Sequence, residues 1–225
     1  MRHDRVVLAY HGCDAAVAER LLSGEPFQES KNDYDWLGAG VYFWEYGPDR
    51  ALQFARDQQR RGKVTEPAVV GALVQLGHCF DLMDTVYTRD LRGAYQNYRS
   101  MLTQHGAMLP RNAGSTPDKK LRRLDCSILN YYLDWLATQG VAFDTVRCGF
   151  QEGERAFPGS GIYRESHIQI SVRNPACLLG VFRPTVQAWM RMRSTRPPGS
   201  PMRASTSTTS SGDPWIPTRT GAGRR

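Results

Sequence analysis

Short apolar and β-branched runs recur along the chain and predict six strands. Each run spans about four to eight residues and is bounded by turn residues, which is typical of strands in a packed sheet. The run at 168–172 alternates apolar with polar residues, so one of its faces is expected in the core. The expected strands are 6–10, 41–44, 69–76, 141–146, 168–172 and 178–182.

Four other stretches space their apolar residues three and four positions apart, which predicts amphipathic helices. Asp14 and Asp49 precede two of them and are expected to be N-caps, because an aspartate side chain accepts hydrogen bonds from free backbone N–H groups. Gly24 is expected to end the first helix. The expected helices are 15 to about 22, 50 to about 61, 91–104 and 126–138.

These elements favour an α+β fold, because the helices are inserted between strands without regular alternation. The chain has 225 residues, enough to bury one good-sized core. Apolar periodicity stops near Pro184, and the sequence beyond is rich in Pro, Ser, Thr and Arg. We therefore expect one domain, 1–184, followed by a basic, disordered tail, 185–225.

The net charge of +7 comes from the C-terminal end of the chain. From Arg183 onward there are eight arginines and one acid, Asp213, so the remainder holds 21 basic and 21 acidic side chains. The sequence pI of about 9.3 is therefore no argument for a nucleic-acid groove on the domain.

Cysteine usage and hydropathy indicate a reduced, soluble protein of the cytoplasm. Five cysteines lie far apart without a Cys-x-x-Cys pair, so neither a disulfide framework nor a zinc site is expected. No apolar run approaches the roughly 18 residues that cross a membrane, and no membrane partner is expected. No Gly-x-Gly-x-x-Gly or Walker loop is present, which disfavours Rossmann and P-loop enzymes.

Two short motifs carry the functional signal. His11-Gly12 follows the first expected strand, and Gly38-Ala39-Gly40-Val41-Tyr42-Phe43 follows about thirty residues later. A glycine beside a histidine allows a ligand to approach the backbone, although such a pair is more often structural. Two glycines weaken a strand, so Gly38 and Gly40 are expected where something must approach it closely.

In this order and spacing, the two motifs resemble the NAD pocket of ADP-ribosyltransferases of the diphtheria-toxin and poly(ADP-ribose) polymerase type. The resemblance implies a split, mixed β-sandwich with inserted helices and NAD in its cleft. His11 would donate to a ribose hydroxyl and Gly12 would clamp the nicotinamide amide. Tyr42 would stack on the nicotinamide ring, with cation–π support, and Phe54 would cover its other face. Ala51 departs from the family, in which many members have a serine that bonds nicotinamide.

The third motif of the family is a glutamate, or sometimes another residue, at the start of a late strand. Gln169 is the positional match in Glu165–Val172. Glutamine can orient a ribose hydroxyl but cannot act as a general base, so Glu165 or His167 would have to supply one. Strand alternation places these three side chains on one polar face, which is expected to look into the cleft. The alternative is an edge strand with a solvated polar face.

The resemblance implies a mono-ADP-ribosyltransferase that uses NAD as substrate, needs no metal and modifies a macromolecule, protein or nucleic acid. The short build is similar to bacterial toxins and defence effectors, which would add a neutralising partner. Two alternatives stay open. One is a catalytically silent module that binds NAD or ADP-ribose, and the other is an NAD-dependent RNA 2′-phosphotransferase, which shares the fold.

Overall fold

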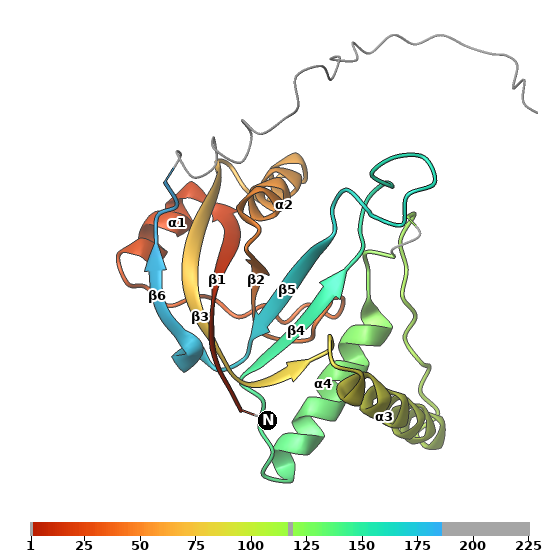
Figure 1. Ribbon diagram of the computed structural model, residues 1–225. Helices are drawn as coiled ribbons and strands as arrows, with labels where there is room; N and C mark the ends of the chain where they lie inside the picture. Colours follow the sequence, from red (N-terminus) through yellow and green to blue (C-terminus); the bar gives the residue numbers. More distant parts are fainter. Residues whose placement is uncertain (1, 117–118, 186–225) are drawn as a thin grey trace, which may run out of the picture.

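Six strands form one mixed sheet in the order β1-β2-β5-β4-β3-β6 (Figure 1). The computed structural model describes residues 2–116 and 119–185. All neighbouring strands are antiparallel except β3 and β4, which are parallel. The strands are β1 (Arg2–Asp14), β2 (Val41–Glu45), β3 (Pro67–Asp81), β4 (Thr145–Phe150), β5 (His167–Val172) and β6 (Leu178–Phe182).

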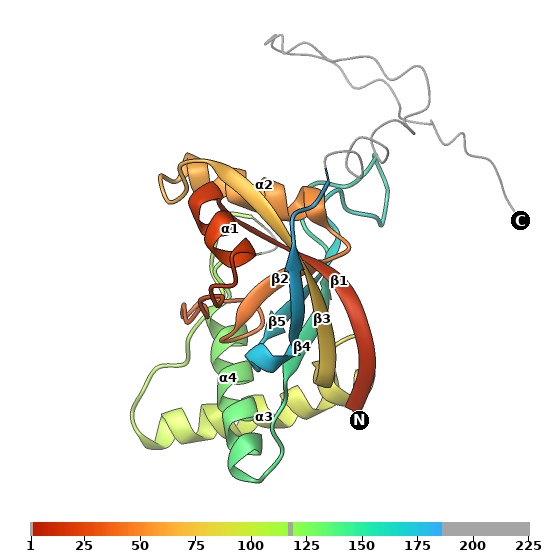
Figure 2. The ribbon, with the colours of Figure 1, turned by 90° about the vertical axis from the view of Figure 1, so that its left-hand side faces the viewer.

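Four helices lie in two pairs at opposite ends of the sheet (Figures 1 and 2). The first pair packs on β1 and β3, and the second pair lies beside β4. A short 3-10 turn, Pro175–Cys177, precedes β6. The helices are α1 (Ala15–Leu22), α2 (Pro48–Arg60), α3 (Thr85–Gln104) and α4 (Arg123–Thr138).

The sheet closes on itself because β1 pairs with both β2 and β3. The first part of β3 pairs with β1 and β6, while its last residues, Cys79–Asp81, pair with β4. The circuit β1–β2–β5–β4–β3 therefore returns to β1. A cluster of buried side chains fills its interior, namely Val7, Ala9, Val41, Phe43, Ala72, Val74, Leu76, Cys79, Ile170, Val172 and Cys177.

A second buried cluster covers the outer face of the same strands. It joins Leu37, Phe80 and Val146 to Leu129 and Leu133 of α4. Because side chains alternate along a strand, the residues between the interior ones point to this outer face. The outer face of β2, β5 and β4 is thus partly a second core, and the rest of it carries the polar side chains described below.

The α+β class and the existence of six strands and four helices are confirmed. The alternative of an edge strand at 168–172 is wrong, because β5 lies between β2 and β4. The strand expected at 141–146 is displaced, since β4 covers Thr145–Phe150. The first strand does not end at His11-Gly12 but continues to Asp14, paired with β3 throughout.

The helix boundaries show which local signals were reliable. Asp14 caps α1 as expected, with its side chain accepting from Ala16 N–H at 3.1 Å. Asp49 is not a cap, because α2 begins at Pro48 after Gly47. Helix α3 begins six residues earlier than expected, where the side chain of Asp84 caps Val86.

Some expectations concern residues that the structure describes only in part. The expected tail lies outside the described residues apart from position 185. Within 2–116 and 119–185, no helix is long and apolar enough to cross a membrane. The cysteines carry free thiols, four of them buried and Cys148 half-buried.

Candidate functional site

His11 and Tyr42, the first two candidate residues, are joined by a hydrogen bond between their strands. His11 Nδ1 lies 2.8 Å from the backbone oxygen of Tyr42. The ladder between β1 and β2 pairs only Ala9 with Glu45 and Tyr10 with Trp44, so β1 has left β2 by the time it reaches His11. The imidazole lies at the opening between the two strands, against the rings of Phe27 and Phe43.

This hydrogen bond fixes the tautomer of His11. A carbonyl oxygen only accepts, so Nδ1 must carry the proton and Nε2 of the neutral ring has a free lone pair. Burial lowers the pKa of His11, against the opposing effect of the bond to Tyr42, which favours the neutral ring. In this tautomer Nε2 can accept a hydrogen bond, and the donation to a ribose hydroxyl that the resemblance implies stays a prediction.

Tyr42 is held by the glycine turn that precedes it. Its hydroxyl donates to the carbonyl of Gly38 at 2.6 Å and accepts from the N–H of Leu37 at 2.8 Å. Its ring packs against the cluster around Leu37 and α4. Burial raises the pKa of Tyr42 well above 10, so the hydroxyl stays neutral and donates. The ring is positioned rigidly, and much of its surface is used by the fold.

Close packing within the protein explains the glycines of the two motifs. A Cβ on Gly12 would lie 2.1 Å from the carbonyl oxygen of Ala51, which places the backbone of α2 directly on β1. Gly40 has φ of 150° and faces Ser171, while Gly38 has φ of 75° and faces Asn130. The elements that approach the backbone at Gly12, Gly40 and Gly38 are therefore α2, β5 and α4, respectively. Ala51 is fully buried in the same contact.

The third candidate, Gln169, shares the outer face with Tyr42 but lies opposite Trp44 in the β2–β5 ladder. It is only 8% exposed although β5 was expected to turn this face toward a cleft. Phe54 reaches the same place from α2 and packs against Trp44, with ring centroids 5.0 Å apart. Trp44 therefore stands between Phe54 and Gln169 on the outer face.

Several buried polar atoms on this outer face make no hydrogen bond within the described part of the chain. Trp44 Nε1 and the Nε and Nη1 atoms of Arg50 are donors, whereas Gln169 Oε1 is an acceptor. His167 Nε2 is also unpartnered. His167 Nδ1 donates to the carbonyl of Glu165 at 2.6 Å, which leaves Nε2 of the neutral ring as a second acceptor.

These unpartnered atoms belong to neighbouring side chains. Trp44 of β2 lies opposite Gln169 of the neighbouring strand β5. His167 precedes Gln169 by two residues and so lies on the same face of β5. The guanidinium of Arg50 lies 5.6 Å from the Trp44 ring centroid. Leaving a buried donor or acceptor unsatisfied costs about 1–3 kcal/mol, and such groups are rare in folded proteins. A cluster of them indicates a place where a ligand or water completes the hydrogen bonds.

The carboxylate of Glu152 contacts two members of this cluster, Arg50 and His167. This buried carboxylate accepts from Arg50 Nη2 and lies 2.7 Å from Lys120 Nζ. It also lies 3.8 Å from His167 Nδ1. Burial alone would raise the pKa of Glu152, but the hydrogen bonds from Lys120 and Arg50 outweigh it and lower the pKa. One carboxylate thus ties α2 and the segment before α4 to the loop between β4 and β5.

Glu165, the other candidate for a base, lies in the turn before β5 and not on the strand. Its carboxylate accepts from Gln53 Nε2 at 3.0 Å and lies 3.9 Å from Arg50. Burial lowers the pKa of His167, with the bond to Glu165 opposing it. His167 is therefore the better base, because its imidazole is neutral and Nε2 carries an unused lone pair.

The structure brings Gln169, Glu165 and Phe54 together around Trp44 and Arg50, while His11 lies at the other edge of β2. Trp44 and Arg50 were not singled out from the sequence as site residues. Because side chains alternate along a strand, the sequence was sufficient to place Trp44 on the same face as Tyr42. Arg50 and Glu152 are 102 residues apart, and no local pattern relates positions at that separation.

Comparison with protein-family models, curated proteins and solved structures finds no match to this chain. Among residues 2–116 and 119–185, no group of three or more His, Cys, Asp and Glu side chains is placed to hold a metal ion. The site must therefore be interpreted from its own geometry.

Proposed function

We propose that the protein is a mono-ADP-ribosyltransferase that uses NAD and modifies a macromolecular acceptor, protein or nucleic acid. The resemblance of the two sequence motifs is the starting point. The observation that supports it most is the strand order β1-β2-β5, which puts the strands that carry His11, Tyr42 and Gln169 side by side although Gln169 is 127 residues from Tyr42 along the chain. The finer fold class, a split β-sandwich of the ADP-ribosyltransferase type, is part of the same proposal.

The unpartnered atoms are suited to the ribose part of NAD. Each ribose hydroxyl both donates and accepts a hydrogen bond. Gln169 Oε1 and His167 Nε2 would accept from hydroxyls, and Trp44 Nε1 would donate to one. The free N–H groups of Arg50 suit a phosphate oxygen, for which a guanidinium is a strong partner. His11 Nε2 supplies a further acceptor at the opening between β1 and β2.

The chemistry is a group transfer in which the ribose–nicotinamide bond breaks and a bond from the same ribose carbon to an acceptor atom forms. Gln169 would orient a ribose hydroxyl and so favour the productive geometry. His167 Nε2 would take the proton that a hydroxyl or amine acceptor loses, because a neutral imidazole is an effective base near neutral pH. The protein's other contribution is to exclude water beneath the Glu152 bridge.

The two alternatives to a transferase fit the site to different degrees. An RNA 2′-phosphotransferase would use several cations in the cleft, and here both Arg50 and Lys120 bind Glu152. A silent NAD-binding module is the more serious alternative. It is favoured by Gln169 at the third position and by Ala51, whose buried contact with Gly12 provides no side-chain bond to nicotinamide.

The test is nicotinamide release from NAD by the purified protein, compared among wild type, Gln169→Ala and Gln139→Ala. Gln139 is exposed at the end of α4 and serves as the matched control. We expect Gln169→Ala to lower the rate by about 100-fold, the size of effect seen when one transition-state contact is removed. Gln139→Ala should retain the wild-type rate. Circular dichroism would verify that each variant is folded.

The acceptor class would be identified by incubating labelled NAD with a cell lysate and separating protein, DNA and RNA. Label in one fraction that Gln169→Ala loses would support transfer and name the acceptor class. Saturable NAD binding without nicotinamide release would support the silent module. Release that is equally fast in Gln169→Ala would contradict the site as assigned.

A further inference from the structure

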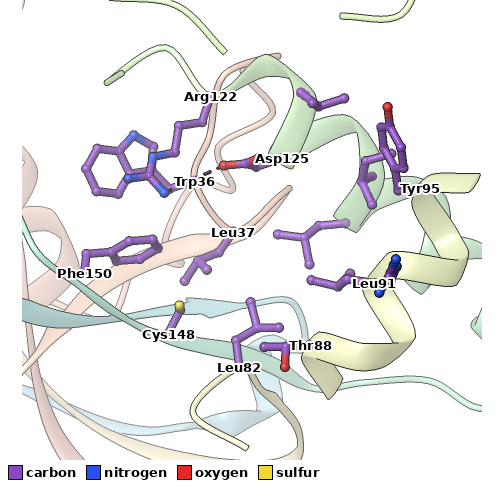
Figure 3. A pocket seen from close by; sticks show the side chains of 14 residues that line it. Trp36, Leu37, Leu82, Thr88, Leu91, Tyr95, Arg122, Asp125, Cys148 and Phe150 are labelled. Carbon is purple, nitrogen blue, oxygen red and sulfur yellow. Dashed lines mark ion pairs between the residues drawn. The ribbon is translucent and has the colours of Figure 1, made fainter. Parts of the chain in front are cut away.

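A pocket of about 380 Å³ is lined by side chains of α3, α4 and β4 and by Trp36 and Leu37 (Figure 3). Its volume falls within the range of about 300–1,000 Å³ that is usual for small-molecule sites. Nine of its lining side chains are apolar: Trp36, Leu37, Leu82, Leu91, Leu124, Ile128, Leu129, Cys148 and Phe150. Its other lining residues are Thr88, Arg92, Tyr95, Arg122 and Asp125.

The pocket exists because α3 is incompletely packed. Helix α3 has 20 residues, yet only Ala94 is buried. Leu91 and Tyr95 face α4 across the pocket and remain half-buried (Figure 3). A helix is stabilised mainly by burying its apolar face, so an occupant between α3 and α4 would complete the packing of both helices.

The walls select for a flat, apolar occupant. Trp36 and Phe150 form one side, with ring centroids 4.8 Å apart, and Tyr95 projects from the opposite helix (Figure 3). The floor is Leu37, Ile128 and Leu129, all buried. Aromatic and branched aliphatic walls of this kind bind flat ring systems by burial and offset stacking.

The charges at the pocket favour an anion. The guanidinium of Arg122 stacks 4.0 Å from the Trp36 ring centroid and lies 3.7 Å from Asp125, so these two charges offset one another. Arg92 is exposed at the pocket and has no ion pair among the residues that the structure describes. One positive charge is therefore left over at the edge of an apolar cavity.

We propose that this pocket is a binding site for a small molecule with a flat apolar body and one negative charge. The body would lie between Leu91 and the Trp36–Phe150 wall, and the anionic group would face Arg92. Binding in this pocket requires neither NAD nor the proposed transferase activity. The wall also contacts the candidate site, because Trp36 and Phe150 pack against His167.

The test uses 8-anilinonaphthalene-1-sulfonate, a flat apolar anion whose fluorescence rises on leaving water. Its uncharged counterpart, N-phenyl-1-naphthylamine, separates the apolar from the ionic contribution. We expect saturable binding of the anion to one site on the native protein. Arg92→Gln should raise the Kd of the anion by about two- to fivefold, the usual range for one exposed charge. The Kd of the uncharged probe should stay unchanged.

Two variants fill the pocket. Leu91→Trp enlarges a wall, and Thr88→Trp closes the exposed edge without altering the buried floor. Val86→Trp, on the same helix but outside the pocket lining and 43% exposed, is the matched control. Loss of binding in both pocket variants but not in Val86→Trp would support the site. Absence of saturable binding, or binding that Thr88→Trp leaves unchanged, would overturn it.

Discussion

Gly12 shows how one residue serves the fold at the place where a function was expected. In the sequence it is the partner of His11 in a ligand-binding motif. In the structure the carbonyl of Ala51 occupies the space where its Cβ would be. The glycine thus permits α2 to lie on β1, and α2 in turn brings Arg50 and Phe54 over Trp44.

We expect Gly12→Ala to lower the free energy of unfolding by about 3 kcal/mol, because backbone and not a flexible side chain blocks the added methyl group. Gly161→Ala is the control, since a Cβ there meets nothing within 4 Å and its φ is not positive. Urea denaturation would measure both. Equal stability of the two variants would show that α2 is not in contact with β1 at Gly12.

The buried imidazoles predict a pH dependence of stability. Burial lowers the pKa of His11 and His167 below the ordinary value of 6.5. The unfolded chain therefore binds more protons than the folded one below that pH, and the free energy of unfolding falls as the pH drops. Urea denaturation at pH 7.5 and 5.5 should show lower stability at pH 5.5, with a smaller difference in His167→Gln. Stability that does not change between these values would contradict the buried, neutral imidazoles.

At the level of elements, the buried carboxylate of Glu152 ties the loop between β4 and β5 to α2. This carboxylate binds Arg50 and Lys120 in a buried position, whereas the neighbouring Glu154 pairs with Arg164 in solvent. The two glutamates are two residues apart on the same loop. They provide a comparison of a buried and an exposed ion pair within one element.

Glu152→Gln should lower the free energy of unfolding by about 3–5 kcal/mol, because it removes the buried negative charge that pairs with Arg50 and Lys120 and leaves Arg50 only the more distant Glu165. Glu154→Gln should change it by less than about 0.5 kcal/mol. Amide hydrogen exchange would locate the effect, with faster exchange expected in residues 151–166 of Glu152→Gln alone. Similar effects of both substitutions would mean that the bridge is not buried.

The elements were largely predictable from the sequence, and their arrangement was not. Apolar runs and helical spacing are local, which is why every strand and helix was found in some form. Helix α3 began early because the Asp84 cap precedes the first apolar repeat. The β2–β5 ladder joins Trp44 to Gln169, and no local pattern sets a register between segments that distant. The unpartnered atoms follow from that register, so they could only be found in the structure.

For the whole molecule, closure of the sheet places two different surfaces on one set of strands. The interior of the circuit holds an apolar core and the buried ion pair between Arg147 and Glu45. The outer face of β2, β5 and β4 carries the candidate site near α2 and the apolar pocket near α3 and α4, separated by Trp36 and Phe150. One sheet thus positions a polar site and an apolar one side by side.

Calorimetric titration of NAD into the purified protein tests whether the polar site binds this dinucleotide. We predict one saturable site whose Kd rises about tenfold in Gln169→Ala, the effect of losing roughly 1.4 kcal/mol of hydrogen bonding, and stays unchanged in Gln139→Ala. Absence of saturable binding, or an equal loss of affinity in both variants, would show that NAD does not bind at the polar site.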